Sequence, residues 1–123
     1  MTTMAAAERQ HFQTALQERQ AFLSTQIDLA ASGKQSEIDR YHAAGIHDQG
    51  EESAEEQVIE NANAVIEHLR AELAQVQSAL RRLAAGEYGE CQNCGRSIPR
   101  ARLEAQPHAT RCVSCQGRVD GAT

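Results

Sequence analysis

The sequence predicts a mostly α-helical protein, in which a long antiparallel helical hairpin of coiled-coil type precedes a small module built on four cysteines and a short C-terminal helix. Three observations predict this fold. Two long stretches repeat an apolar side chain about once per helical turn, and a short polar segment with two glycines separates them. All four cysteines stand in two C-x2-C pairs near the C-terminus. We therefore expect a hairpin over residues 1–85, with its tip near 44–54, and a four-cysteine module over 86–123.

The composition limits the size of the core. The 123 residues include no tryptophan, two tyrosines and two phenylalanines, so little aromatic area is available for a thick globular core. A thin contact between two helices, reinforced by a bound metal, suits such a chain better. No segment approaches the roughly 20 apolar residues of a membrane span, and residues 1–10 lack the apolar run of a secretory signal. We therefore expect a cytoplasmic protein with reduced cysteines and no membrane contact.

The first helix is expected from residue 5 to about residue 43. Its apolar side chains recur near multiples of one helical turn: Phe12, Leu16, Leu23, Ile27, Ala30, Ile38 and Tyr41. Phe22 and Leu29 form a weaker second edge, which we expect to widen the contact with the second helix, the alternatives being that it covers a flank of the hairpin or meets a partner. Gly33 costs on the order of 1 kcal/mol in a helix relative to alanine, so we expect a kink or a short break at that point.

The second helix is expected over residues 54–85. Its apolar positions step by three and four: Val58, Ala62, Val65, Leu69, Leu73, Val76, Leu80 and Leu83. Gly86 follows the last of them and is suited to the left-handed residue that ends many helices. Because residues 44–54 form only a short connection, the two helices should be antiparallel neighbours, with the tip at the opposite end of the hairpin from the cysteines.

The net charge of −5 is concentrated near that tip. Residues 37–60 contain eight acidic side chains and a single arginine, whereas the remainder of the chain is nearly balanced. An acidic protein of this kind is poorly suited to general attraction to nucleic acid phosphates, which favours clustered lysine and arginine.

The cysteine spacing predicts one structural zinc ion bound by Cys91, Cys94, Cys112 and Cys115. Four thiolates fill a tetrahedral site and leave no position for water or substrate, so we expect no catalysis there. Disulfides or a redox C-x2-C motif are the competing interpretations. A turn at Gly95 and a short helix over 113–119 are expected around the site, whose small core we assign to four apolar residues: Ile98, Leu103, Ala105 and Val113.

The stretch that carries these cysteines resembles a known family. The run Tyr88-Gly-Glu-Cys91-Gln-Asn-Cys94-Gly95, followed by Arg102-Leu-Glu-Ala105 and Cys112-Val-Ser-Cys115, resembles the zinc-finger signature of the DksA/TraR family of bacterial, phage and plasmid transcription regulators. The resemblance implies a protein that binds RNA polymerase and inserts its hairpin into the secondary channel. Family members carry an Asp-x-x-Asp-x-Ala element at the tip. Counting back from the first cysteine without a gap, that element falls here on Asp48, Glu51 and Ser53.

Some members of this family respond to ppGpp, the alarmone of the stringent response, through basic residues. The same count places His68, Gln75 and Gln116 at those positions, and neutral side chains are poor partners for a highly charged phosphate ligand. Arg70 and Arg118 lie nearby in sequence and are the candidate substitutes for a ppGpp or polymerase contact. Weak or absent ppGpp dependence is therefore the expectation.

The sequence thus predicts a monomeric transcription regulator that is not an enzyme, binds RNA polymerase and makes no direct sequence-specific contact with DNA. Two alternatives stay open at this point. One is a zinc-stapled coiled-coil adaptor for another protein. The other is a factor that assists transcript cleavage, as Gre-type factors do with a similar acidic hairpin.

Overall fold

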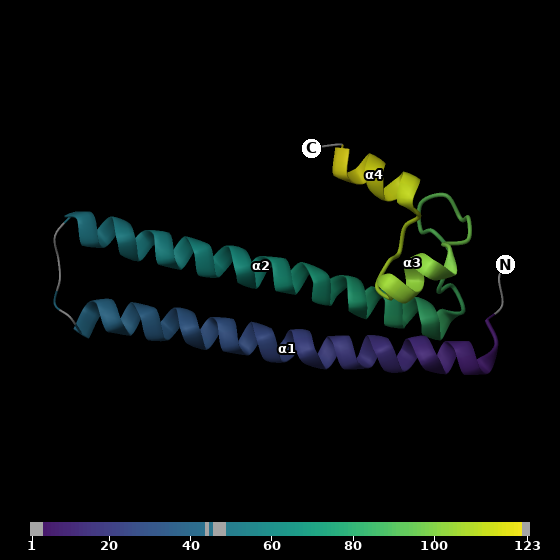
Figure 1. Cartoon of the computed structure of the whole chain (residues 1–123), viewed down its shortest axis with the longest axis horizontal. Coiled ribbons are helices and arrows are strands. Elements are labelled where there is room, and N and C mark those ends of the chain that lie inside the picture. The colour runs from purple at the N-terminus through teal and green to yellow at the C-terminus, as the bar shows by residue number, and fades with distance from the viewer. Residues whose placement is uncertain (1–3, 44, 46–48, 122–123) are drawn as a thin grey trace. The chain divides into compact units, whose positions relative to one another are not determined.

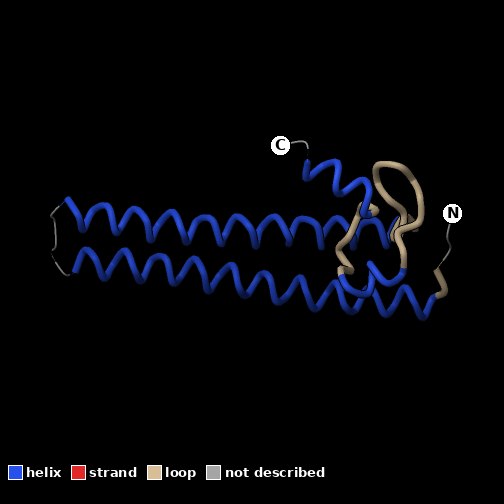
Figure 2. Tube along the Cα trace, turned by 45° about the horizontal axis from the view of Figure 1, so that its top comes forward, coloured by secondary structure: helices blue, strands red, loops and turns tan. Residues whose placement is uncertain are grey.

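The structure is a computed structural model that describes residues 4–43, 45 and 49–121, with the side chains of residues 49–52 left out of the description. These residues form four helices, namely α1 (Ala6–Ala43), α2 (Gln49–Ala85), α3 (Arg100–Ala105) and α4 (Val113–Gly121) (Figure 1). Within the described part of the chain, β-structure is limited to one isolated antiparallel bridge between Glu90 and Ser97, and loops join the two short helices (Figure 2). The predicted fold class is therefore confirmed.

The two long helices differ from the prediction in two places. The expected break at Gly33 is wrong, because α1 runs unbroken through it. One glycine costs only on the order of 1 kcal/mol, which the helix-forming alanine, glutamine and glutamate residues around it outweigh. In addition, α2 begins at Gln49, five residues before the predicted start at 54.

The C-terminus of α2 ends as the sequence predicts. Gly86 has a φ of +77°, a left-handed conformation that glycine adopts without strain. The N–H of Gly86 donates to the carbonyl of Leu83 at 3.3 Å and the N–H of Glu87 donates to the carbonyl of Arg82 at 2.8 Å. This pair of hydrogen bonds is the Schellman arrangement. It satisfies two carbonyls at the end of α2 and turns the chain toward the cysteines.

The chain divides into two compact units, which are described separately. The first comprises Met1–Ala21 and Leu73–Thr123, and the second comprises Phe22–Glu72. The predicted division near residue 85 stays a prediction. No helix among the described residues is long and apolar enough to cross a membrane.

In the first unit, the start of α1 packs against the end of α2 and against the cysteine module. Its buried core contains side chains from all three parts: Phe12, Leu16, Val76, Ala79, Leu83, Tyr88, Cys91, Ile98, Leu103, Ala109 and Cys115. On its surface, Glu8 pairs with Arg100 at 3.2 Å and His11 lies 3.1 Å from Glu104. These contacts attach α3 to the first turns of α1.

In the second unit, the remaining parts of α1 and α2 form a helical hairpin. Leu23 and Ile66 are buried. Two polar contacts cross between the helices: Lys34 Nζ donates to Asn63 Oδ1 at 2.8 Å, and His42 Nε2 lies 3.2 Å from Glu55 Oε1. Lys34 precedes His42 in α1, whereas its partner Asn63 follows Glu55, the partner of His42, in α2. The two helices are therefore antiparallel within this unit.

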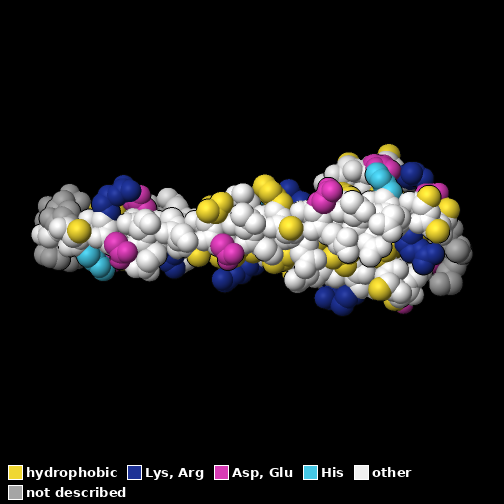
Figure 3. Space-filling view, turned by 90° about the horizontal axis from the view of Figure 1, so that it is seen from below, with side chains coloured by type: hydrophobic (Ala, Val, Ile, Leu, Met, Phe, Trp, Pro, Cys, Tyr) yellow, Lys and Arg dark blue, Asp and Glu magenta, His cyan; other side chains and the backbone are white. Residues whose placement is uncertain are grey.

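Three apolar side chains of the second unit are more exposed than the sequence led us to expect. Phe22, Leu29 and Val65 are 49%, 60% and 53% exposed, so the prediction that they belong to the helix contact is wrong. Successive residues of a helix point about 100° apart around its axis. When Leu23 faces the other helix, its neighbour Phe22 points away from the contact, and Val65 points away for the same reason when Ile66 is buried. On the face shown in Figure 3, hydrophobic side chains reach the surface in separate patches between polar ones.

Candidate metal centre

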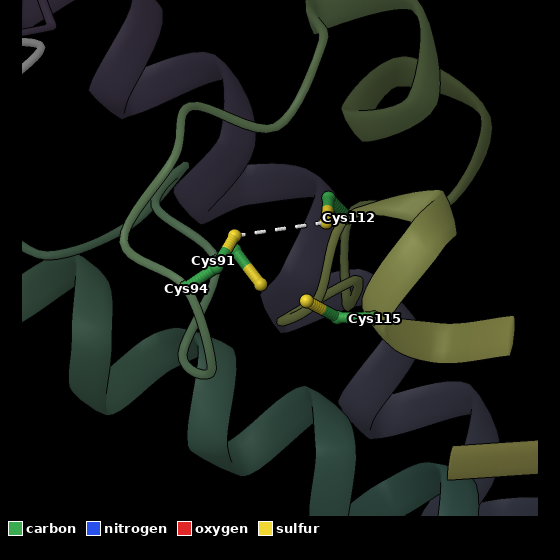
Figure 4. A group of neighbouring side chains, drawn as sticks. All are labelled: Cys91, Cys94, Cys112 and Cys115. Atoms are coloured by element: carbon green, nitrogen blue, oxygen red, sulfur yellow. Dashed lines mark hydrogen bonds between the residues drawn. The ribbon is translucent and has the colours of Figure 1, made fainter. Parts of the chain in front are cut away.

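The four cysteine sulfurs converge on one point. Cys91 and Cys94 lie in the loop between Glu90 and Ser97, the two residues of the isolated β-bridge. Cys112 directly precedes α4, and Cys115 lies in the first turn of that helix. Their sulfur atoms all lie within 4.8 Å of one another, and the distance from Cys94 Sγ to Cys112 Sγ is 3.8 Å. Figure 4 shows the side chains pointing inward from two separate segments. The sequence therefore predicted this cluster correctly.

Backbone hydrogen bonds hold the first C-x2-C turn in shape. The N–H of Cys91 donates to the carbonyl of Arg96 at 2.8 Å, and the N–H of Gly95 donates to the carbonyl of Cys91 at 2.9 Å. Gly95 has a φ of +75°, as expected for the glycine that reverses the chain after the second cysteine. The N–H of Gln92 donates to the carbonyl of Thr110 at 2.8 Å, which brings the second cysteine pair alongside the first.

The geometry fits a tetrahedral zinc ion. With a zinc–sulfur distance of about 2.3 Å, neighbouring sulfurs of a tetrahedral site lie about 3.8 Å apart, which agrees with the 3.8 Å between Cys94 and Cys112. All four cysteines are free, and none forms a disulfide. Four thiolates provide the complete ligand set of a structural zinc site. The chain therefore binds one structural zinc ion through Cys91, Cys94, Cys112 and Cys115.

The electrostatics of the cluster also favour a bound cation. Burial opposes ionisation of Cys91, but hydrogen bonds from the backbone N–H groups of Cys112, Cys94 and Asn93 outweigh it and lower the pKa of this thiol to about 5. A backbone hydrogen bond from Cys115 lowers the pKa of Cys112. The neighbouring thiol of Cys112, followed by burial, raises the pKa of Cys115 to about 12. Since crowded thiolates repel one another, all four can be ionised together only with a positive ion between them.

Side chains outside the cluster fix the loops that carry it. The hydroxyl of Tyr88 donates to the carbonyl of Pro107 at 2.9 Å, and the pKa of Tyr88 is raised, first by burial and then by the Glu104 carboxylate. Arg82 Nη2 donates to the carbonyl of Glu90 at 2.7 Å, so the end of α2 holds the residue next to Cys91. These contacts join the module to α2 and close the segment from Tyr88 to Pro107, which carries the first cysteine pair.

The small core of the module differs in part from the prediction. Ile98 and Leu103 are buried as expected, but Ala105 is exposed and Val113 is 66% exposed, so their assignment to the core is wrong. Val113 begins α4, where Cys115 must face the zinc, and residues two apart on a helix point in different directions. Tyr88 and Ala109, which were not predicted to be core residues, are buried instead. The position of Tyr88 just before Gly89 and Cys91 was the available signal for its role.

The predicted tip residues fall largely outside the described part of the structure. Asp48 lies outside the described residues, and Glu51 is in α2 without a described side chain. Ser53 is an exposed residue of α2. Their proposed role at the tip therefore stays a prediction.

The residues considered for a ppGpp contact are found in both compact units. Gln75 and Gln116 line the same cavity of about 370 Å³ in the first unit, together with Arg102, His108 and Arg111. His68 and Arg70 are exposed residues of α2 in the second unit. Arg118 lies next to the metal centre instead, with its Nη2 atom 3.8 Å from Cys115 Sγ. The contact of Arg118 with a cysteine sulfur was missed from the sequence.

Comparison with known sequences places the finger in a defined class. Residues 86–121 match the family model described as the prokaryotic dksA/traR C4-type zinc finger. The RNA polymerase-binding transcription factor DksA of Caulobacter vibrioides is 46% identical over 46 residues, which cover 37% of this chain and only about a third (32%) of that protein. The DksA of Escherichia coli K12 is 26% identical over 113 residues, covering 92% of this chain and 72% of the relative.

Solved structures share the fold. The transcription factor DksA2 from Pseudomonas aeruginosa matches with a TM-score of 0.77 at 24% identity, covering 95% of this chain and 86% of that one. A transcriptional regulator from Chlamydia trachomatis matches with a TM-score of 0.57 at 24% identity, covering 97% of this chain and 94% of that one. At this identity the likeness concerns the fold alone. Finger sequence and ligand set agree: residues 86–121 form a zinc finger of the prokaryotic dksA/traR C4 type, in a chain whose fold resembles that of DksA2.

Proposed function

We propose that this chain binds RNA polymerase and modulates transcription initiation by inserting its helical hairpin into the secondary channel, with the acidic tip near the active site. The single observation that carries the proposal is the DksA/TraR-type finger built on four convergent cysteines. Relatives that carry this finger are described as RNA polymerase-binding transcription factors. The hairpin helices α1 and α2 that precede it supply an element suited to entering a narrow channel.

The distribution of charge supports this division of roles. Residues 22–72 contain eleven acidic side chains against three basic ones, whereas the remaining residues contain six acidic and nine basic ones. A hairpin segment with a net charge of −8 would be attracted to positive groups or metal ions of a partner and repelled by nucleic acid phosphates. The other unit, with a net charge of +3, has too weak a charge for binding that is driven by DNA phosphates.

In this proposal the carboxylates of Asp48 and Glu51 perturb the surroundings of the polymerase's Mg²⁺ or its mobile catalytic elements. Carboxylates are hard ligands that suit Mg²⁺, although the proposal requires only their field and not direct coordination. The second acid is a glutamate and the following small residue is Ser53, where the family has aspartate and alanine. The longer side chain keeps the charge but changes its reach.

The chain itself contributes no catalysis in this proposal. The zinc ligand set is complete, so the ion supplies neither a bound water nor a Lewis-acid position. Its role is to fold the module that joins the hairpin to the polymerase surface.

We further propose that ppGpp has little effect. The positions that the resemblance connects with ppGpp hold Gln75 and Gln116, and their neutral amides are poor partners for a highly charged phosphate ligand.

Binding is tested by pull-down of core RNA polymerase with the zinc-loaded full chain, wild type and the double variant Asp48→Asn/Glu51→Gln. We expect both proteins to bind at micromolar concentration, because the tip acts after binding. Failure of the wild type to bind would favour an adaptor for another protein. Stimulated cleavage of transcripts in backtracked complexes would instead favour a Gre-like factor. Running the same assays with and without ppGpp tests the proposed indifference to the alarmone.

A further inference from the structure

Arg118 lies beside one of the four zinc ligands. Its Nη2 atom is 3.8 Å from Cys115 Sγ, within reach of an N–H···S hydrogen bond. Both residues belong to α4 and are three positions apart, so the helix brings their side chains to the same face. We propose that Arg118 compensates the negative charge of the zinc–thiolate centre through Cys115 and thereby slows the loss of zinc.

Two of the other ligands, Cys91 and Cys112, accept hydrogen bonds from backbone N–H groups. The sulfur of Cys91 accepts hydrogen bonds from the N–H groups of Asn93, Cys94 and Cys112, and the sulfur of Cys112 accepts one from the N–H of Cys115. Cys115 differs because it lies within a helix, where N–H groups bond to carbonyls one turn earlier, as the N–H of Gln116 does to the carbonyl of Cys112 at 2.9 Å. A side chain is therefore the natural donor to its sulfur, and Arg118 is placed to be that donor.

The charge of the centre makes this donor important. Four thiolates and one Zn²⁺ carry a net charge of about −2, and Cys91 and Cys115 are only 2% and 3% exposed. A buried negative charge is costly unless positive groups or hydrogen-bond donors compensate it. A guanidinium supplies both, since hydrogen bonds from a charged donor are stronger than those from neutral groups. Mutation of a group that hydrogen-bonds a metal ligand typically lowers the affinity for the metal by about 10- to 100-fold.

This inference concerns the retention of zinc and does not rest on the proposed binding of RNA polymerase. It also gives Arg118 a role other than the ppGpp or polymerase contact predicted from the sequence. Cys115 lies in the first turn of α4, and Arg118, which provides the compensating charge, lies in the next turn. A chain that ended at residue 117 would therefore keep all four cysteines and still hold zinc less firmly.

The test uses the full zinc-loaded chain and four proteins: the wild type, Arg118→Gln, Arg118→Lys and Arg81→Gln. Arg81 is exposed on α2, and the arginine–sulfur contact at the metal centre belongs to Arg118, so the Arg81 variant removes the same charge without removing that contact. The rate of zinc transfer to the chromophoric chelator 4-(2-pyridylazo)resorcinol is measured for each. We expect release about tenfold faster from Arg118→Gln, with Arg118→Lys much closer to the wild type and Arg81→Gln indistinguishable from it.

Replacement of zinc by Co²⁺ provides a second measurement that folding alone does not affect. Removing a hydrogen bond from a thiolate should move the sulfur-to-cobalt charge-transfer band to lower energy in Arg118→Gln but not in Arg81→Gln. Equal zinc release and equal cobalt spectra for Arg118→Gln and Arg81→Gln would overturn the inference. It would also be overturned if Arg118→Lys lost zinc as fast as Arg118→Gln with an unmoved cobalt band, since fraying of α4 would then explain the faster loss.

Discussion

The centre of the Phe12 ring in α1 lies 5.3 Å from the centre of the Tyr88 ring. Tyr88 lies in the segment that links the end of α2 to the zinc finger. Phe12 is fully buried and Tyr88 is 5% exposed. The guanidinium of Arg100 lies 6.0 Å from the centre of the Phe12 ring. One aromatic side chain of the first helix thus packs against the finger that follows the second, within the same compact unit.

Phe12→Ala should therefore destabilise the protein strongly. Removal of a fully buried phenylalanine typically costs about 3–5 kcal/mol of unfolding free energy. Phe22→Ala is the matched control, because Phe22 lies in the same helix but is 49% exposed, and it should cost well under half as much. Urea denaturation of the zinc-loaded chain measures both. Equal losses for the two variants would show that the Phe12–Tyr88 contact does not dominate this core.

Tyr88→Phe should cost less, on the order of 1 kcal/mol, because it removes only the hydrogen bond from the Tyr88 hydroxyl to the carbonyl of Pro107. The ring contact with Phe12 remains in this variant. The zinc finger should become more accessible to proteolysis near Pro107 than it is in the wild type. An unchanged unfolding midpoint together with unchanged cleavage would contradict the role given to the hydroxyl.

Removal of zinc should unfold the finger, because binding of the metal and folding of such a site are coupled. A strong chelator, or Cys91→Ser, should abolish the protection of amide hydrogens around Cys91, Ile98 and Cys115 from exchange. The amides of residues 54–72, which belong to the second unit, should keep their protection. A finger that keeps full protection without the metal would exclude a structural role for zinc.

The stability contributed by Glu104 should depend on pH. The hydrogen bond with His11 is the largest cause of a lowered pKa for this carboxyl, whose ordinary value is 4.5, and Arg100 adds to the effect. A lowered pKa in the folded state means that the stabilisation is present above pH 4.5 and is lost as the pH falls below it. Wild type and Glu104→Gln should therefore differ in unfolding midpoint at pH 7 and converge in acid. A difference that persisted at pH 3 would contradict this assignment.

The sequence predicted the helices and the metal ligands well, for physical reasons that are local. The periodic apolar residues determine α1 and α2, Gly86 and Gly95 adopt the left-handed conformations that their places require, and the two C-x2-C pairs bring four sulfurs together. These features depend on neighbours a few residues away. The continuity of α1 through Gly33 was missed because a single unfavourable residue was given too much weight against a long helix.

Contacts between distant segments were harder to predict. Val65 follows the apolar repeat and yet is exposed, because two helices alone cover only one narrow face of each other. The burial of Tyr88 depends on Phe12, and the place of Arg118 depends on how α4 leaves the zinc site. The first arrangement does not follow from periodicity or spacing, because it joins segments far apart in the sequence, whereas the second follows the i, i+3 spacing of α4 once that helix is known to carry Cys115.

The lifetime of open complexes at a ribosomal RNA promoter tests the central claim most directly. It is measured with wild type, with the tip variant Asp48→Asn/Glu51→Gln, and with Glu60→Gln/Glu67→Gln, which removes the same charge from exposed positions of α2. The account predicts a several-fold change in lifetime with the wild type and with the Glu60/Glu67 variant, and none with the tip variant. An effect of the tip variant equal to that of the wild type would contradict it.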